Sequence, residues 1–231
     1  MLTSNHPSDS ESALYSKNMS AITDAKPVYH YWAGVASRNV YLFYTLGYNG
    51  KLDSITHKGD QPYPGTPEWS AGSGFTKSKM GQLPALSMGG VEIGQSRAIL
   101  ATLCKHFGIG SDLSVPDYAK SEELVDHASD IHNMLGKAHY GSDRTVAMDA
   151  VFGEGGGVKK ALGAFEDHLD GTVTTGHLCY AAALNLFVRL QPDALDNFVK
   201  TKAFYDKIQE NEGVKAANER SPYPYFKRNS D

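Results

Sequence analysis

The sequence predicts a small α/β domain followed by an all-helical domain. Between residues 28 and 108, strand and helix patterns follow the order β-α-β and then β-β-α, which is typical of a mixed sheet with packed helices. A connector containing Gly, Ser and Pro spans 109–117, and beyond it the apolar residues recur at helical spacing only. We therefore expect domains at 27–108 and 118–231, joined by the 109–117 linker.

Composition excludes several classes of protein. The chain has 22 basic and 26 acidic residues with no block of five basic residues, so nucleic acid is not an expected partner. No apolar run approaches the ~18 residues that cross a bilayer, so we expect a soluble, cytoplasmic protein without a membrane partner. Residues 1–26 are rich in Ser, Asp and Asn, lack the features of a signal peptide, and predict a disordered tail.

The cysteines and histidines give no sign of a disulfide or a metal. Cys104 and Cys179 lie in apolar helical stretches and are expected to be reduced and buried. The nine histidines show neither H-x-x-x-H spacing nor a cysteine at ligand spacing, so no metal is predicted.

The first domain divides at its glycine and proline residues. A strand is predicted over 28–32, a helix capped by Ser37 and ended by Gly47, and a second strand over 51–56. A long loop spans 59–79. A hairpin then joins strands at 83–88 and 91–93 through a Gly-Gly turn, and Ser96 caps a helix that Gly108 closes. The helices predicted for the second domain span 118–139, 158–169, 178–190 and 198–218.

Three motifs carry a resemblance to a known family. The runs GQLPAL at 81–86 and GQSRAIL at 94–100 resemble the glutathione-binding core of cytosolic glutathione transferases. The run YHYW at 29–32 is similar to the first strand of the sigma, mu and pi classes, which use a tyrosine. The resemblance covers about residues 27–226 and implies a thioredoxin-like domain packed on a helical domain, usually as a homodimer, with glutathione as co-substrate.

The resemblance assigns the peptide backbone of glutathione to Leu83 and Pro84, within the motif that begins at Gln82. A cis Pro84 would leave the Leu83 backbone free to pair with an extended peptide; the alternative is an ordinary strand-entry proline. Gln95 and Ser96 begin a helix whose amides and dipole favour the γ-glutamyl carboxylate, although a Ser at that place also serves as a simple cap.

Two further parts of the glutathione site follow from the resemblance. Trp69, with Lys77 or Lys79, would hold the glycine end of glutathione; the alternative is a solvated surface lysine. Asp130 would reach the amino group of the glutathione in the neighbouring subunit, and a solvated helical face is the competing interpretation.

Tyr31 is the predicted catalytic residue. A thiol with pKa near 8.5 is mostly protonated at pH 7, and a phenolic O–H directed at the sulfur stabilises the reactive thiolate. Ser37 is the alternative, because SRNV at 37–40 is similar to the motif of the serine-type classes. A family capping motif, Thr-x-x-Asp, has become Thr174-Thr175-Gly176-His177, which puts the stability of the second domain in question because His cannot accept two backbone N–H bonds as a carboxylate does.

The resemblance implies conjugation of the glutathione thiolate to small electrophiles, the chemistry of detoxification, with sigma-type isomerase or peroxidase activity as a variant. The alternative is a non-catalytic relative that keeps the fold and offers a helical surface to partners.

Overall fold

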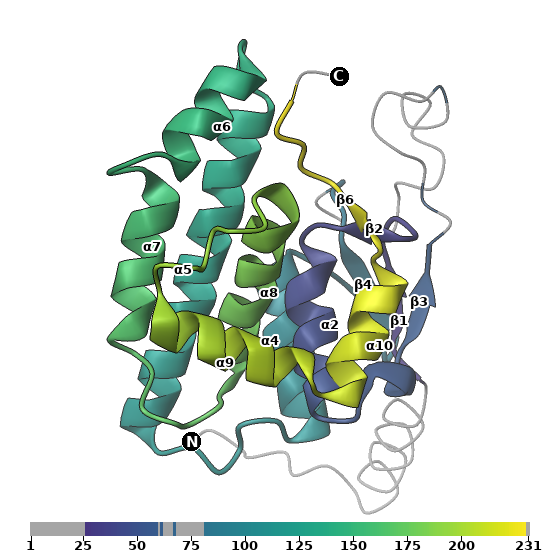
Figure 1. Ribbon diagram of the computed structural model, residues 1–231. Helices are drawn as coiled ribbons and strands as arrows, with labels where there is room; N and C mark the ends of the chain where they lie inside the picture. Colours follow the sequence, from purple (N-terminus) through teal and green to yellow (C-terminus); the bar gives the residue numbers. More distant parts are fainter. Residues whose placement is uncertain (1–25, 60, 62–66, 68–80, 230–231) are drawn as a thin grey trace, which may run out of the picture.

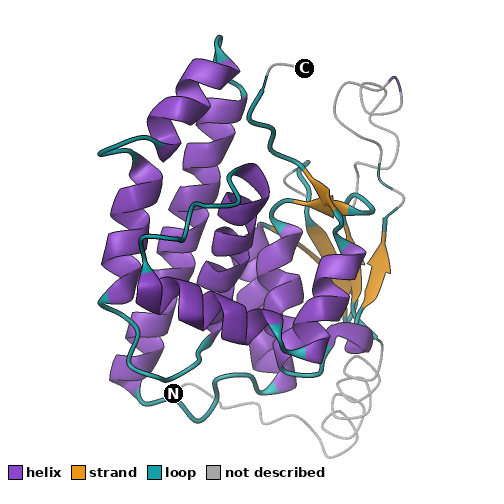
Figure 2. Cartoon of the chain, viewed as in Figure 1, coloured by secondary structure: helices purple, strands orange, loops and turns teal. Residues whose placement is uncertain are grey.

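The computed structural model describes residues 26–59, 61, 67 and 81–229. The strands gather at one side of the molecule and helices form the rest (Figures 1 and 2). This arrangement confirms the predicted fold class. The tail expected over 1–26 lies outside the described residues except for Lys26, as does most of the loop expected over 59–79.

The main sheet has four strands in the order β3-β1-β4-β5. β1 pairs in parallel with β3 and antiparallel with β4, and Tyr29 lies between His57 and Leu86 in this register. Gly89 and Gly90 both have positive φ in the turn between β4 and β5, which confirms the predicted hairpin. The strand bounds are Val28–His30 for β1, Thr56–Lys58 for β3, Ala85–Met88 for β4 and Val91–Gly94 for β5.

The first helix, α2 (Asn39–Tyr48), does not start or end as predicted. Ser37 is not its cap: Arg38 occupies the cap position and offers no side-chain bond. The Asn39 side chain accepts from the Ser37 N–H (2.9 Å) and donates to Ser221 Oγ (2.7 Å), so these side-chain bonds fix the start of the helix. Gly47 stays inside the helix, which runs one residue further.

Two other local predictions were wrong. The strand expected over 51–56 is a 3-10 turn, Leu52–Ser54, followed by β3. Leu52 and Ile55 are the buried residues there, and their spacing of three fits a helical turn better than an alternating strand. Ser96 is the first residue of α4 (Ser96–Phe107) and Gln95 is its cap, whereas Gly108 closes the helix in the left-handed conformation as expected.

The second part of the chain contains one more helix than the spacing predicted before residue 198, and a break after it. Asp143 caps the missed helix α6. Asn211 accepts from the N–H groups of Gly213 and Val214, which divides the helix expected over 198–218 into two. The bounds are Val115–His139 for α5, Arg144–Phe152 for α6, Gly157–Glu166 for α7, Thr175–Leu190 for α8, Val199–Gln209 for α9 and Glu212–Arg220 for α10. The domain boundaries stay a prediction.

Helix α2 is the centre of the packing, with all but its last residue buried. Figure 1 shows α2 between α8 and α10. Gly47 of α2 and Gly213 of α10 meet backbone to backbone: a Cβ on Gly47 would lie 2.3 Å from the Gly213 carbonyl oxygen. Beyond α10, β6 (Tyr223–Pro224) pairs in parallel with β2 (Val35–Ala36), which returns the end of the chain to the first domain.

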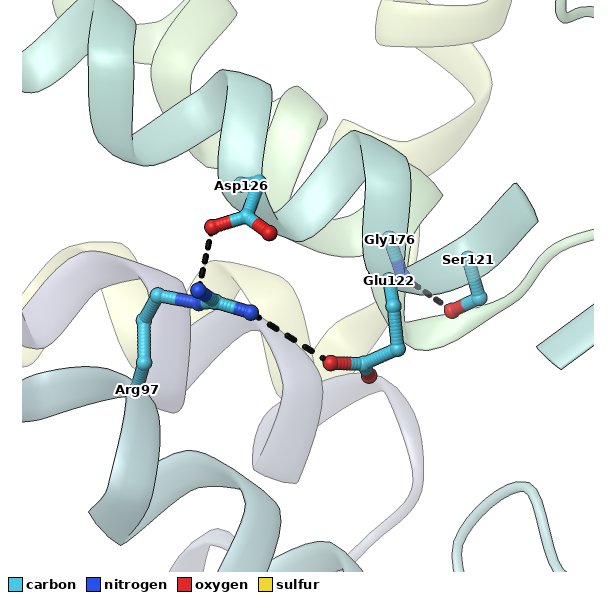
Figure 3. A network of polar contacts seen from close by, with 5 residues as sticks. All are labelled: Arg97, Ser121, Glu122, Asp126 and Gly176. Atoms are coloured by element: carbon cyan, nitrogen blue, oxygen red, sulfur yellow. Dashed lines mark hydrogen bonds and ion pairs between the residues drawn. The ribbon is translucent and has the colours of Figure 1, made fainter. Parts of the chain in front are cut away.

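A polar network joins α4, α5 and α8 (Figure 3). Arg97 of α4 pairs with Glu122 (3.5 Å) and Asp126 of α5. Ser121 Oγ accepts from the Gly176 N–H at 2.9 Å, which ties the start of α8 to α5. No helix within the described ranges is both long and apolar enough to cross a bilayer.

His177 replaces the expected carboxylate without loss of the cap. The Thr174 side chain accepts from the His177 N–H, and His177 Nδ1 accepts from the Thr174 N–H at 3.3 Å. The other ring nitrogen lies 3.2 Å from the His168 carbonyl oxygen, which fits a neutral ring that donates from Nε2. The concern about local stability therefore does not apply to the neutral form.

Replacement of Gly47 by Ala is expected to lower the free energy of unfolding by about 1–3 kcal/mol, because the added methyl group forces α2 and α10 apart. Urea unfolding measures the change. Gly163→Ala is the matched control: Gly163 is also helical, but a Cβ there meets nothing within 4 Å, so the variant should be slightly more stable. Equal effects of the two substitutions would contradict the close packing.

His177→Asp is expected to flatten the loss of stability in acid. Burial lowers the pKa of His177 below its usual 6.5, so the folded state favours the neutral ring. Stability from this group is complete above pH 6.5 and is lost as pH falls below it. Urea unfolding at about pH 8 and pH 5 measures the free energy of unfolding of both proteins. Between the two pH values, the wild type should lose more of this free energy than the variant does. A constant difference would exclude His177 as a source of acid sensitivity.

Candidate functional site

A cleft of about 1030 Å³ lies where the two parts of the chain meet. Its walls come from residues just after β1, from the C-terminal half of α5, from α6 and from the segment after α10. Tyr31, Ser37, Leu83 and Asp130 all line it. The structure thus brings both candidate hydroxyl groups to one cavity of a size typical for small-molecule sites.

Tyr31 is the first residue beyond β1 and only 2% exposed. Its N–H donates to the Lys58 carbonyl at 3.2 Å, which extends the pairing of β1 with β3. Burial raises the pKa of its phenol to about 12, against the opposing effects of a hydrogen bond with the Ser37 side chain, the positive charge of Arg38 and the Arg38 backbone amide. The phenol carries its proton at neutral pH, as an ordinary tyrosine does, and can act as a hydrogen-bond donor.

Ser37 belongs to the same part of the cleft as Tyr31. Its side chain is buried and opposes the rise in the pKa of the Tyr31 phenol. Both residues line the cleft. The question is therefore which of the two hydroxyl groups contacts the sulfur.

Arg38 belongs to the same group, and sequence reasoning gave it no role. Its Nη2 donates to Asn133 Oδ1 at 2.8 Å, and it forms no ion pair with any described carboxylate. A cation at a helix N-terminus opposes the helix dipole, so its place before α2 is a signal that the residue serves something other than the helix.

Of the glutathione-binding residues predicted at 82–84 and 95–96, only Leu83 lines the cleft. The Leu83–Pro84 bond is cis, as expected, and Leu83 lines the cleft. Gln95 donates to Gln82 Oε1 at 3.2 Å, and neither side chain lines the cleft. Ser96 lines a small neighbouring crevice together with Arg38.

The start of α4 is suited to an anion. Gln95 has a φ of 70°, in the left-handed region that residues other than glycine rarely adopt, and such outliers are often held at functional sites. No side chain caps α4, so its first-turn N–H groups lack a side-chain partner among the described residues.

Of the four remaining predicted residues, the structure describes only Asp130. Asp130 is exposed on α5 and lines the cleft of its own chain. Trp69, Lys77 and Lys79 lie outside the described residues. Among the residues that the structure describes, no group of three or more His, Cys, Asp or Glu side chains is arranged to hold a metal ion. Cys104 and Cys179 are free and buried as predicted, and burial raises the pKa of both thiols.

The segment after α10 closes one side of the cleft. Tyr225 stacks on Trp32 with ring centroids 5.5 Å apart, and its hydroxyl contacts that of Tyr140. Arg228 anchors the segment through Asp149 (2.8 Å), Gln191 (2.5 Å) and the Phe152 ring. In the sequence, Arg228 lies 79 positions from Asp149 and 37 positions from Gln191. Sequence patterns do not reveal contacts over such separations.

Arg228→Ala is expected to speed amide hydrogen exchange in residues 222–229 by about five- to thirtyfold, because an ion pair and a cation–π contact each contribute about 0.5–1 kcal/mol. The Tyr223 and Tyr225 amides, which donate to Gly34 and Ala36, report the opening. Lys227→Ala is the control, since the exposed Lys227 side chain forms no ion pair with a described residue. Similar exchange in both variants would show that Arg228 does not anchor the segment.

No protein-family model and no curated protein matches the sequence significantly. Solved structures do match. A pi-class glutathione S-transferase of Onchocerca volvulus is similar with a TM-score of 0.68 and 18% identity, over 83% of this chain and 91% of that chain. Prostaglandin synthase D of Nilaparvata lugens gives 0.68 and 19%, over 87% of this chain and 100% of that chain.

A third similar structure is Na-GST-3, a glutathione S-transferase of the hookworm Necator americanus that is described as monomeric. Its TM-score is 0.70 at 20% identity, over 87% of this chain and 100% of that chain. At these identities the likeness concerns the fold. The arrangement of a mixed sheet with a cis Leu83–Pro84 bond and a helical second part is therefore the fold of the cytosolic glutathione transferases.

Proposed function

We propose that this protein is a glutathione transferase of the tyrosine type, in which Tyr31 stabilises the thiolate of glutathione. The observation that carries the proposal is the buried Tyr31 side chain, which lines one cleft together with Ser37, Arg38 and Leu83. The fold shared with glutathione transferases supports it.

The chemistry follows from the state of the phenol. Its O–H donates to the sulfur and stabilises the thiolate relative to the thiol. A hydrogen bond to a charged group is worth about 1.5–3 kcal/mol, and each ~1.4 kcal/mol lowers the thiol pKa by one unit. The thiol pKa should therefore fall by about one to two units from ~8.5, which brings it near neutral pH.

Glutathione would bind in an extended form beside β4. The Leu83 backbone pairs with its peptide, and Gln95 and Ser96 hold the γ-glutamyl carboxylate at the start of α4. Trp69 and Lys77 or Lys79 are proposed for the glycine end. The positive φ of Gln95 and the uncapped first turn of α4 support the placement of the carboxylate.

A homodimer is part of the proposal, with Asp130 directed to the glutathione of the partner subunit. Asp130 is exposed, as such a role requires. The electrophile enters the cleft between Tyr31 and the segment after α10. Conjugation, or isomerase or peroxidase chemistry of the sigma type, takes place there. A cytoplasmic location suits the two free cysteines.

Tyr31→Phe is expected to bind immobilised glutathione as the wild type does, but to lower kcat/KM for 1-chloro-2,4-dinitrobenzene by about 10–100-fold through loss of one charge-assisted bond. Tyr29→Phe, two residues earlier in β1, is the control and should keep full activity. Ser37→Ala should have a smaller effect, because Ser37 acts through Tyr31.

Three outcomes would contradict the proposal in different ways. Full activity in Tyr31→Phe, with activity lost in Ser37→Ala, would point to serine-type chemistry. Retention on glutathione without any conjugation by the wild type would point to a non-catalytic relative. No retention at all would remove glutathione as a ligand.

A further inference from the structure

The chain between β1 and α2 is held by the segment after α10. The Tyr223 N–H donates to the Gly34 carbonyl at 2.8 Å, where β6 pairs with β2 (Figure 1). The Tyr225 N–H donates to the Ala36 carbonyl at 3.2 Å. Residues 37 and 38 follow directly and line the cleft. The backbone that carries these two side chains therefore starts from a strand that pairs with the segment after α10.

Asn39 joins the same two parts of the chain through its side chain. Its Oδ1 accepts from the Ser37 N–H at 2.9 Å, and its Nδ2 donates to Ser221 Oγ at 2.7 Å. All three residues are buried. Because an unpaired polar group is costly in such a place, the two bonds favour one arrangement of the turn and the segment. The start of α2 and the start of the segment are thereby fixed to each other.

A residue that only starts a helix does not need the second of these bonds. Asn211 shows the local pattern, because its side chain accepts from N–H groups within the first turn of α10. Asn39 also bonds a residue 182 positions away in the sequence, at the start of the segment whose later residues line the cleft. The role of Asn39 therefore extends beyond the start of α2.

Ser37 and Arg38 are the residues of this turn that act on Tyr31. Burial raises the pKa of the Tyr31 phenol to about 12, and the Ser37 side chain and the positive charge of Arg38 oppose this rise. A positive charge beside the phenol also favours a thiolate that the phenol contacts. A displaced turn would move both side chains relative to the phenol, so the formation of the thiolate is sensitive to whatever fixes the turn.

We propose that Asn39 is a positioning residue for thiolate formation, and that it makes this step depend on the docking of segment 221–229 beside β2. This inference rests on the proposed glutathione transferase function. Tyr225 and Phe226 of the segment belong to the cleft wall, where the electrophile is proposed to bind. An electrophile that stabilises the docked segment therefore also favours the thiolate, because the coupling between two sites is reciprocal.

The pKa of the glutathione thiol in the complex, measured from its ultraviolet absorbance against pH, tests the coupling. We expect Asn39→Ala to raise this pKa by about 0.3–1 unit, because the turn loses its bond to the helix and its joint to the segment. Ser221→Ala leaves the bond to the Ser37 N–H intact and should raise it by a smaller amount. The double variant should match Asn39→Ala, because the Ser221 hydroxyl acts through Asn39.

Asn49→Ala is the matched control on the same helix. The Asn49 side chain donates to the Thr45 carbonyl at 2.8 Å, at the other end of α2. Its loss weakens the end of the helix without a change in the turn, so the pKa of the bound thiol should stay that of the wild type.

An unchanged thiol pKa in Asn39→Ala, or an equal rise in Asn49→Ala, would overturn the inference. A double variant whose rise is the sum of the two single rises would also overturn it, because Ser221 would then act by another route. If Asn39→Ala does not fold, as judged by its thermal transition, Ser221→Ala decides alone against the same control. Failure of the underlying function looks different: the wild type would then not bind immobilised glutathione, or would bind it with a thiol pKa near ~8.5.

Discussion

The burial of the Tyr31 hydroxyl is the constraint on which the rest of the site depends. A phenol with an ordinary pKa near 10 keeps its proton at neutral pH, and burial raises the pKa of Tyr31 to about 12. Ser37 and Arg38 lie in the turn between β2 and α2 and line the cleft with Tyr31. Asn39 fixes that turn by bonding the Ser37 N–H on one side and Ser221 on the other. The position of one hydroxyl thus depends on residues from both ends of the chain.

The packing of helix α2 explains why both ends of the chain contribute to the site. It packs against α8 and meets α10 at Gly47 and Gly213, where neither backbone leaves room for a side chain. The close contact holds the end of α10 near β2, and the segment that follows places Tyr225 over Trp32. The last part of the second domain therefore completes a cleft that begins in the first.

Local patterns in the sequence were enough for the elements whose ends are set by glycine: the Gly89-Gly90 hairpin and the close of α4 at Gly108. They were not enough where a distant side chain decides. The local sequence predicts Ser37 as the cap of α2, but the hydrogen bond from the Asn39 side chain to Ser221 fixes the start of the helix. His177 looks like a defect, but the His168 carbonyl and the Thr174 amide accommodate a neutral ring. The motif at 94–100 predicts a glutathione-binding role for Gln95 and Ser96, which stays a prediction, whereas Arg38, His132 and Tyr225 reach the cleft only through tertiary contacts.

The ionisation of bound glutathione tests the central claim most directly. The thiolate absorbs ultraviolet light more strongly than the thiol, so its absorbance in the complex, followed against pH, gives the pKa of the bound thiol. The account predicts a pKa about one to two units below ~8.5 in the wild type, and a return toward ~8.5 in Tyr31→Phe, because only the phenolic donor has been removed. An equally low pKa in Tyr31→Phe would contradict it and assign the stabilisation of the thiolate to another group.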